Sequence, residues 1–259
     1  MAYVINNQGN TLTMEEFFET LMNHRLIFAG EKHDSRLAHE AELTLLEELF
    51  KRNSLLVLAL EMFERDVQGT LDAYLRAEIS EELFLESTRP WPNYEEDYRP
   101  LVEFAKEKGI PVIAANVPRR AAASVSRSNE ISADVLGADS FYLPERIHFD
   151  SREYRERFMA TLEGMPRGGP MGRLDPEGLY KAQVLKDATM AASLEPFLDR
   201  TILFCCGHFH SDYHLGIPYQ LQKNYPEIKI AVIAFASSLV ELNEKDTSRL
   251  ADFIWIGEG

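Results

Sequence analysis

Carboxylates and imidazoles are the side chains of this sequence best suited to chemistry. Glu31 and His33 belong to a Gly-x-x-His tetrapeptide, and His210 ends a second tetrapeptide of the same form. Glu61 directly follows six apolar residues, where a carboxylate without a partner is costly to bury. These four residues are therefore our candidates for a catalytic or ligand-binding centre.

Two kinds of chemistry suit this set. Carboxylates and neutral imidazoles bind divalent metals such as zinc, manganese or iron, so Glu31, His33, Glu61 and His210 could form a metal site. Such a metal lowers the pKa of a bound water, and a spare glutamate could act as general base. Without a metal, a Glu–His pair could still activate water for hydrolysis. Each motif also fits a structural role, as a hydrogen-bonded histidine or a buried salt bridge.

Several other chemistries are disfavoured. The sequence has no Gly-x-Ser-x-Gly elbow, no Walker loop and no Gly-x-Gly-x-x-Gly turn after the first apolar run. Cys205 and Cys206 are adjacent, so on a strand they point to opposite faces and form no redox pair. A Cys-x-x-Cys-His motif is also missing, which excludes covalent haem attachment.

Further polar residues follow a third apolar run or share one face of a predicted helix. Asn116 and Arg119 follow another apolar run. Tyr180, Gln183 and Asp187 have the i, i+3, i+7 spacing that puts side chains on one helical face. We expect the pocket around the centre to be lined by His39, Asn116, Arg119, Gln183, Asp187 and His208.

Short apolar runs alternate with amphipathic segments, which predicts an α/β fold with a mostly parallel central sheet flanked by helices. Runs that are apolar throughout are typical of strands covered on both faces. The predicted strands are Leu26–Ala29, Leu55–Leu60, Pro111–Ala115, Thr201–Cys206, Ile228–Phe235 and Phe253–Ile256. The predicted helices are Arg36–Lys51, a pair within Asp66–Trp91, Leu101–Lys108 and Leu179–Leu198.

The candidate residues follow the ends of four predicted strands. In open α/β sheets, ligands bind in the crevice beyond the carboxyl ends of the strands. If the strands are parallel neighbours, Glu31, His33, Glu61, Asn116 and His210 converge on one pocket.

A chain of 259 residues has room for one to two domains. We predict a single α/β domain over 1–259, with a helical cap or lid at 124–178 and a hinge at 164–172. The alternative for that segment is a surface excursion with no role.

The charge balance limits the classes of partner that the chain is expected to bind. Against 42 acidic residues stand 27 basic ones, a formal net charge of −15, so phosphate backbones and anionic lipids repel the chain. We therefore expect a small-molecule ligand and no nucleic acid. The longest apolar stretch, Ile228–Val240, is too short to span a membrane. With no signal segment visible at the start, a cytoplasmic location is expected.

These motifs together resemble the ChaN-type haem-binding family, within the Tiki superfamily of TraB-like proteins and erythromycin-esterase-like hydrolases. The resemblance covers about Leu26 to Ile256 and is weakest from Ser124 to Gly178. Its motifs are Gly30-Glu-Lys-His33-Asp34 with His39, Leu60-Glu61-Met-Phe63 with Gln68, Asp97-Tyr-Arg-Pro100, Ala115-Asn-Val-Pro-Arg119, Gln183 with Lys186-Asp187, and Gly207-x-x-His210 before Gly216-Ile-Pro218.

The resemblance implies two activities. Across the superfamily, the Gly-x-x-His motifs and carboxylates imply a metal or catalytic centre at Glu31, His33, Glu61 and His210. The ChaN branch implies haem bound between paired subunits, hence a homodimer, through a tyrosine ligand. Tyrosine and histidine can both ligate haem iron, and this chain offers Tyr98, Tyr142, Tyr154, Tyr180 and His148.

Members of the ChaN branch are described as membrane-tethered lipoproteins, whereas this sequence shows no lipoprotein signal or acylated cysteine. On the resemblance of the motifs, our first hypothesis is a haem- or iron-binding protein of the ChaN type. The alternative is a divalent-metal-dependent hydrolase of ester or peptide bonds that uses the same pocket.

Overall fold

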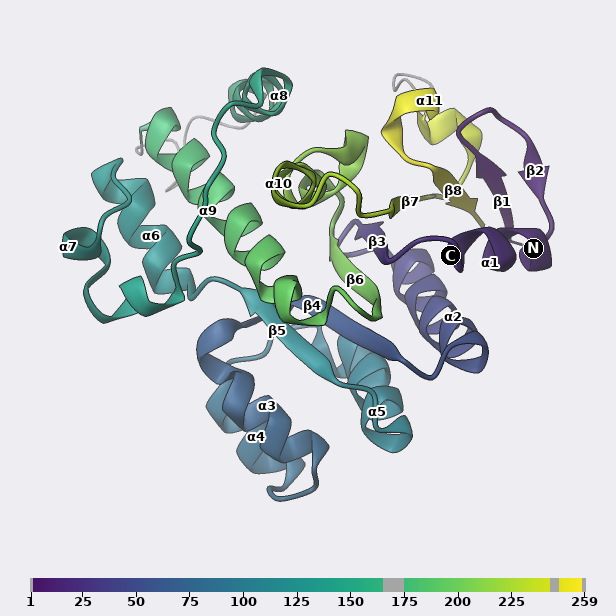
Figure 1. The fold of residues 1–259 in the computed structure, drawn as a ribbon, viewed down its shortest axis with the longest axis horizontal. Helices are drawn as coiled ribbons and strands as arrows, with labels where there is room; N and C mark the ends of the chain where they lie inside the picture. The colour runs from purple at the N-terminus through teal and green to yellow at the C-terminus, as the bar shows by residue number, and fades with distance from the viewer. Residues whose placement is uncertain (1, 165–174, 243–246, 258–259) are drawn as a thin grey trace.

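The computed structural model describes residues 2–164, 175–242 and 247–257. Over these residues, one eight-stranded sheet runs through the molecule with helices on both faces (Figure 1). The strand order is β2-β1-β8-β7-β3-β6-β4-β5, with five parallel pairings and two antiparallel ones. The predicted α/β class with a mostly parallel sheet is confirmed.

All six predicted strands form. They are β3 (Leu26–Glu31), β4 (Leu56–Glu64), β5 (Val112–Asn116), β6 (Thr201–Gly207), β7 (Ile230–Ala236) and β8 (Phe253–Ile256). Every residue of β3, β4, β5, β6 and β8 is buried. Helices on both faces exclude water from these strands, which explains their unbroken apolar runs.

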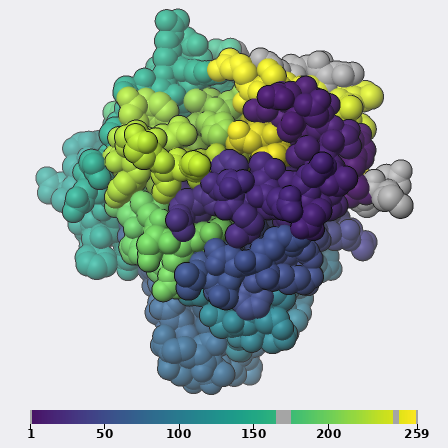
Figure 2. All heavy atoms as spheres, turned by 45° about the vertical axis from the view of Figure 1, so that its right-hand side comes forward, coloured from purple at the N-terminus to yellow at the C-terminus, as the bar shows by residue number. Residues whose placement is uncertain are grey.

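The sequence did not reveal an N-terminal hairpin of β1 (Tyr3–Asn6) and β2 (Thr11–Leu12). This hairpin is antiparallel, and β1 extends the sheet by pairing with β8. The first and last strands of the chain therefore lie side by side, visible as purple against yellow in Figure 2. Strands of four and two residues carry too little periodicity to detect.

Helices form a layer on each face of the sheet. One layer contains α1 (Met14–Leu21), α2 (Arg36–Arg52), α3 (Gln68–Leu75), α4 (Glu81–Thr88) and α5 (Arg99–Lys108). The other contains α9 (Pro176–Leu194), α10 (Ile217–Asn224) and α11 (Thr247–Leu250), with α6 (Arg119–Ser128) packed on α9. The helix pair expected between residues 66 and 91 is present as α3 and α4. The long helix ends at Leu194, before a 3-10 turn that contains Pro196.

The segment predicted as a cap is mostly helical. It includes α7 (Ala133–Leu136), a 3-10 turn at Gly137–Tyr142 and α8 (Arg152–Glu163). The predicted hinge is residues 164–172, of which 165–172 lie outside the described residues, and a lid role for the segment stays a prediction. No helix in the described ranges is long and apolar enough to cross a membrane.

The order of the strands decides where a site can form. β6 lies between β3 and β4, and β5 pairs with the far side of β4, all four being parallel. Their carboxyl ends therefore lie in one row. This row is at the place in the sheet where the direction of the chain connections reverses. Such a switch point is the usual ligand position in open α/β folds.

Candidate functional site

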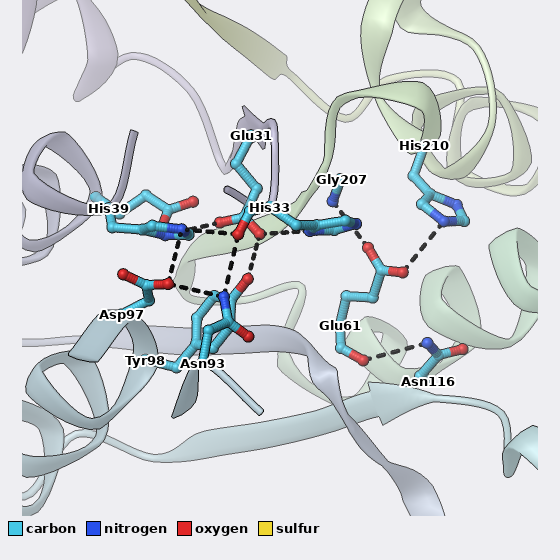
Figure 3. Close-up of polar contacts among 11 residues, drawn as sticks. Glu31, His33, His39, Glu61, Asn93, Asp97, Tyr98, Asn116, Gly207 and His210 are labelled. Carbon is cyan, nitrogen blue, oxygen red and sulfur yellow. Dashed lines mark hydrogen bonds and ion pairs between the residues drawn. The ribbon is translucent and has the colours of Figure 1, made fainter. Parts of the chain in front are cut away.

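The carboxyl ends of β3, β4 and β6 bring the four candidate residues together (Figure 3). Glu31 ends β3, Glu61 lies in β4, and His210 ends the turn that follows β6. The Nδ1 of His33 donates to Oε1 of Glu31 at 2.7 Å. The Nε2 of His210 lies 3.2 Å from Oε1 of Glu61.

The glycines of the two tetrapeptides have a reciprocal packing role. A Cβ on Gly207 would lie 2.8 Å from the ring of His33, and a Cβ on Gly30 would lie 2.7 Å from Oγ of Ser211 and 3.3 Å from Cα of His208. Glycine is therefore favoured at each position, because residues of the other motif pack against it. This contact explains why the motif occurs twice on neighbouring strands.

Glu61 is aimed by an irregularity in its strand. Leu60 pairs with Ala114, yet Glu64 pairs with Asn116, so β4 has extra residues opposite β5 at this point. Such bulges redirect side chains near sites. The backbone N–H of Gly207 donates to Oε2 of Glu61 at 2.8 Å, and Nδ2 of Asn116 donates to its backbone oxygen at 3.2 Å.

A buried polar cluster surrounds Glu31. The Tyr98 hydroxyl, at the end of a π-helical turn (Tyr94–Tyr98), donates to Oε1 of Glu31 at 2.6 Å. The Nδ1 of His39 lies 3.3 Å from Oε2 of Glu31 and 3.3 Å from Oε2 of Glu42. Burial alone raises the pKa of Glu31, but its contacts with His33, His39 and Tyr98 lower that pKa to about 2. Burial and the charge of Glu31 raise the pKa of Glu42.

A second buried cluster surrounds His210. Its Nδ1 donates to Asp187 at 2.5 Å, and the Tyr154 hydroxyl donates to the other oxygen of Asp187 at 2.5 Å. Although burial lowers the pKa of His210, Glu61 and Asp187 raise it to about 10. Burial raises the pKa of Glu61, but His210, His33 and the Gly207 N–H lower it to about 2. At neutral pH the cleft floor therefore contains an imidazolium–carboxylate pair.

A cleft of about 640 Å³ opens above both clusters. The side chains of His33 and His208 are 44% and 36% exposed. The Nδ1 of His208 donates to Asp212 at 2.9 Å, which leaves Nε2 as the ring atom available to a ligand. The lining residues are Glu31, Lys32, His33, Asp34, Arg157, Phe158, Thr161, Leu162, Gln183, Gly207, His208, Phe209 and His210.

The predicted pocket-lining residues divide into three groups. Gln183 and His208 line the cleft. His39, Asn116 and Asp187 lie buried behind it and contact the lining residues or Glu61. Arg119 corrects our expectation, since its guanidinium pairs with Glu64 at 2.6 Å and is not part of the lining.

The expected haem ligands do not meet at this cleft. Tyr98 is fully buried against Glu31 and Tyr180 is 3% exposed, so neither hydroxyl can reach an iron at the surface. Tyr154 is likewise buried against Asp187. Tyr142 lines a separate cavity of about 410 Å³ at β5. His148 bonds to Asn224 of α10 at 2.9 Å. Haem ligation by Tyr98, Tyr142, Tyr180 or His148 stays a prediction.

The close metal-binding geometry also differs from the predicted set. In the part of the chain that the structure describes, the group whose potential ligand atoms all lie within 4.8 Å is Glu31, His39 and Glu42. His33, Glu61 and His210 are not in that group: His33 contacts Glu31 through the other oxygen, Oε1, and His210 pairs with Glu61 and Asp187. Glu31 is the residue common to the predicted set and the observed one.

Sequence reasoning missed several residues of the site. Glu42 is three residues after His39 on α2, a spacing that puts both on one helical face and was available to detect. Asp97 belongs to a motif we noted, but its place 3.5 Å from Nε2 of His39 depends on the fold. The cleft wall from α8, including Arg157 and Phe158, had no sequence signal.

Comparison with known proteins identifies a matching family model and a curated relative. The family model described as "Haem-binding uptake, Tiki superfamily, ChaN" matches residues 17–221. A curated relative, the chloroplastic protein RETICULATA-RELATED 5 of Arabidopsis thaliana, is 23% identical over 92% of this chain. The chain spans 35% of that relative's length.

Two solved structures share the fold. ChaN of Campylobacter jejuni, solved with cofacial haem, has a TM-score of 0.77 at 18% identity and covers 100% of this chain and 97% of its own. An erythromycin esterase in its open conformation has a TM-score of 0.56 at 12% identity, covering 100% and 99% of the two chains. At these identities, the likeness concerns the fold.

Proposed function

The chain belongs to the haem-binding uptake family of the Tiki superfamily that includes ChaN, and from this premise we propose that it binds haem in the cleft above β3 and β6. The observation that carries the proposal is an apolar-walled cleft of about 640 Å³ with a carboxylate-oriented imidazole, His208. Cavities of 300–1,000 Å³ are typical of small-molecule sites.

The lining suits the parts of a haem. Phe158, Leu162 and Phe209 offer apolar surface to the macrocycle. Lys32 and Arg157 also line the cleft, where they pair with Glu241 and Asp212, and their remaining N–H groups can donate to the propionates. When bound, haem supplies an iron that accepts imidazole nitrogen.

His208 is the ligand that the geometry favours. Asp212 accepts from its Nδ1, and a carboxylate at one ring nitrogen fixes the tautomer and raises the basicity of the other. The same Asp212 carboxylate accepts from Arg157 at 2.9 Å, which holds it in place. His210 is less suitable because both of its nitrogens face carboxylates.

Haemin titration followed by the Soret band tests the proposal. We expect a saturable shift in the wild type that His208→Ala weakens by at least about tenfold, as loss of a metal ligand or its support does. His148→Ala and Tyr142→Phe are matched controls, expected to bind as the wild type does. A wild type without a saturable shift contradicts haem binding, and full binding by His208→Ala contradicts the ligand assignment. Light scattering of the complex tests the predicted homodimer.

A second candidate, hydrolysis in the same cleft, is favoured by the Tyr154–Asp187–His210–Glu61 chain of contacts at its floor. The raised pKa of His210, about 10, suits a proton donor better than a base at neutral pH. We therefore rank hydrolysis second. Ester and peptide panels test it: no turnover by the wild type would remove this candidate, and turnover unchanged in His210→Gln would remove the role of His210 in it.

A further inference from the structure

We propose that Glu31, His39 and Glu42 bind one divalent cation of the borderline class, Zn²⁺, Mn²⁺ or Fe²⁺, in a buried site behind the cleft. All three residues are at least nine-tenths buried, with exposed fractions of 0%, 6% and 0%. Two carboxylates and one imidazole form a mixed oxygen and nitrogen set, which suits these metals.

Two of the three separations between ligand atoms fit a bound metal, and the third pair, from Glu31 and Glu42, lies within 4.8 Å. The Nδ1 of His39 lies 3.3 Å from Oε2 of Glu31 and 3.3 Å from Oε2 of Glu42. Metal–ligand bonds of about 2.0–2.2 Å in a tetrahedral arrangement place neighbouring ligand atoms roughly 3.3–3.6 Å apart. The observed separations therefore match the edges of a coordination polyhedron.

Two carboxylate oxygens of the cluster are not satisfied by N–H or O–H donors of the surrounding residues. Among the described residues, Oε2 of Glu31 and Oε1 of Glu42 are buried and have no donor while both carboxylates are ionised. Without a cation, the raised pKa of Glu42 favours a shared proton between Glu42 and Glu31, and a cation would take the place of that proton. An imidazole Nδ1 carries a single proton, so His39 cannot donate to both carboxylates at once. Buried polar atoms without partners are uncommon and point to a missing ion or water. Oε2 of Glu31 is the atom that faces Nδ1 of His39, so it is aimed into the proposed site.

The surroundings of His39 are those of a metal-ligating histidine. Its other nitrogen, Nε2, lies 3.2 Å from the backbone oxygen of His33 and 3.5 Å from Oδ2 of Asp97. Asn93 donates to the same two acceptors, at 3.0 Å and 2.8 Å. Ligating histidines almost always donate their second N–H to a carbonyl or carboxylate in this way. Nδ1 is thereby left to face the two glutamates, as Figure 3 shows for Glu31.

Two of the ligands come from α2 and one from β3, whose Glu31 also lines the cleft. His39 and Glu42 are three apart on α2, whose first turn is capped by Ser35. Glu31 ends the central strand β3, and its Oε1 accepts from His33 and Tyr98. A cation would therefore join α2 to β3 and fix the carboxylate that orients His33. Neither His39 nor Glu42 lines the cleft, so the site goes beyond the proposed haem binding.

The test measures metal content directly. Protein expressed with added Zn²⁺ or Mn²⁺, then desalted, is assayed by plasma mass spectrometry, and its melting temperature is compared after refolding with metal or with EDTA. We expect one equivalent of metal and a higher melting temperature for the metal-refolded wild type. Glu42→Gln and His39→Gln should lose both, whereas Glu40→Gln, exposed on the same helix, should keep both.

A third variant keeps the proposal testable if the buried substitutions fail to fold. Asp97→Asn leaves the ligands in place but weakens the support of His39, so affinity should fall by about 10–100-fold. A wild type that takes up neither metal, or a folded Glu42→Gln with one equivalent, overturns the proposal. Haemin titration of Glu42→Gln separates the two sites, since its Soret shift reports only on the cleft.

Discussion

Buried carboxylates distinguish this site at the residue scale. Glu31, Glu61 and Asp187 are at most 4% exposed, and each contacts an imidazole. Removing one partner of such a pair leaves an uncompensated buried charge. These contacts therefore couple the protonation of the site to the stability of the fold.

The stability of the protein should depend on pH in both directions. His210 has its pKa raised from 6.5 to about 10, so its contribution is complete below pH 6.5 and is lost as the pH rises through 10. Glu61 has its pKa lowered from 4.5 to about 2, so its contribution is complete above pH 4.5 and is lost as the pH falls toward 2. We expect this pair to stabilise most between pH 4.5 and 6.5.

Urea unfolding from pH 3 to pH 10 checks this expectation. His210→Gln should lower the unfolding free energy by roughly 3–5 kcal/mol at pH 6 and should flatten the loss of stability above pH 7. An alkaline limb equally steep in the variant would show that His210 is not the responsible group.

Gly207→Ala tests the reciprocal packing of the two tetrapeptides. The added Cβ would lie 2.8 Å from the His33 ring, so the ring must shift from its position beside Gly207. We expect a loss of about 1–3 kcal/mol in unfolding free energy, together with weaker ligand binding. Gly69→Ala is the control, because its Cβ meets no atom within 4 Å. Equal effects of the two substitutions would contradict the packing argument.

At the scale of elements, α9 supports the site from the second helical layer. It carries Gln183 to the cleft and Asp187 to His210. Its first turn approaches α6 so closely that a Cβ on Gly178 would lie 2.5 Å from the backbone oxygen of Ser126. The position of α9, and with it the orientation of His210, depends on this contact.

Gly178→Ala should therefore separate α6 from α9. We expect a cost of about 1–3 kcal/mol from overpacking, measured as a lower urea midpoint, with a reduced affinity for haemin. Gly164→Ala, whose Cβ would have its nearest contact at 3.6 Å, serves as the control. Unchanged stability of Gly178→Ala would show that α6 yields without cost.

The protein carries a formal net charge of −15, and its excess negative side chains repel one another in the compact state. Screening of that repulsion should stabilise the fold, because the Debye length shrinks as salt is added. Between 20 mM and 300 mM NaCl we expect a rise in melting temperature of roughly 2–4 °C, which corresponds to about 1 kcal/mol. A fall in melting temperature would mean that the surface ion pairs outweigh the repulsion.

The α/β class, the six long strands and the position of Glu31, Glu61 and the second Gly-x-x-His motif at strand ends could all be predicted from the amino-acid sequence. These features are local, since an unbroken apolar run and the polar residue after it are read within about ten residues of chain. The sequence did not reveal the β1–β2 hairpin, whose strands are too short to show a period.

Which side chains contact one another depends on the three-dimensional fold. His39 turns to Glu31 and Glu42, His210 turns to Glu61 and Asp187, and Tyr98 is buried rather than exposed. These pairings join residues up to 149 positions apart, and they depend on strand order and on the bulge in β4. Local sequence patterns fix which face or end of an element a residue occupies, but long-range packing selects its partner.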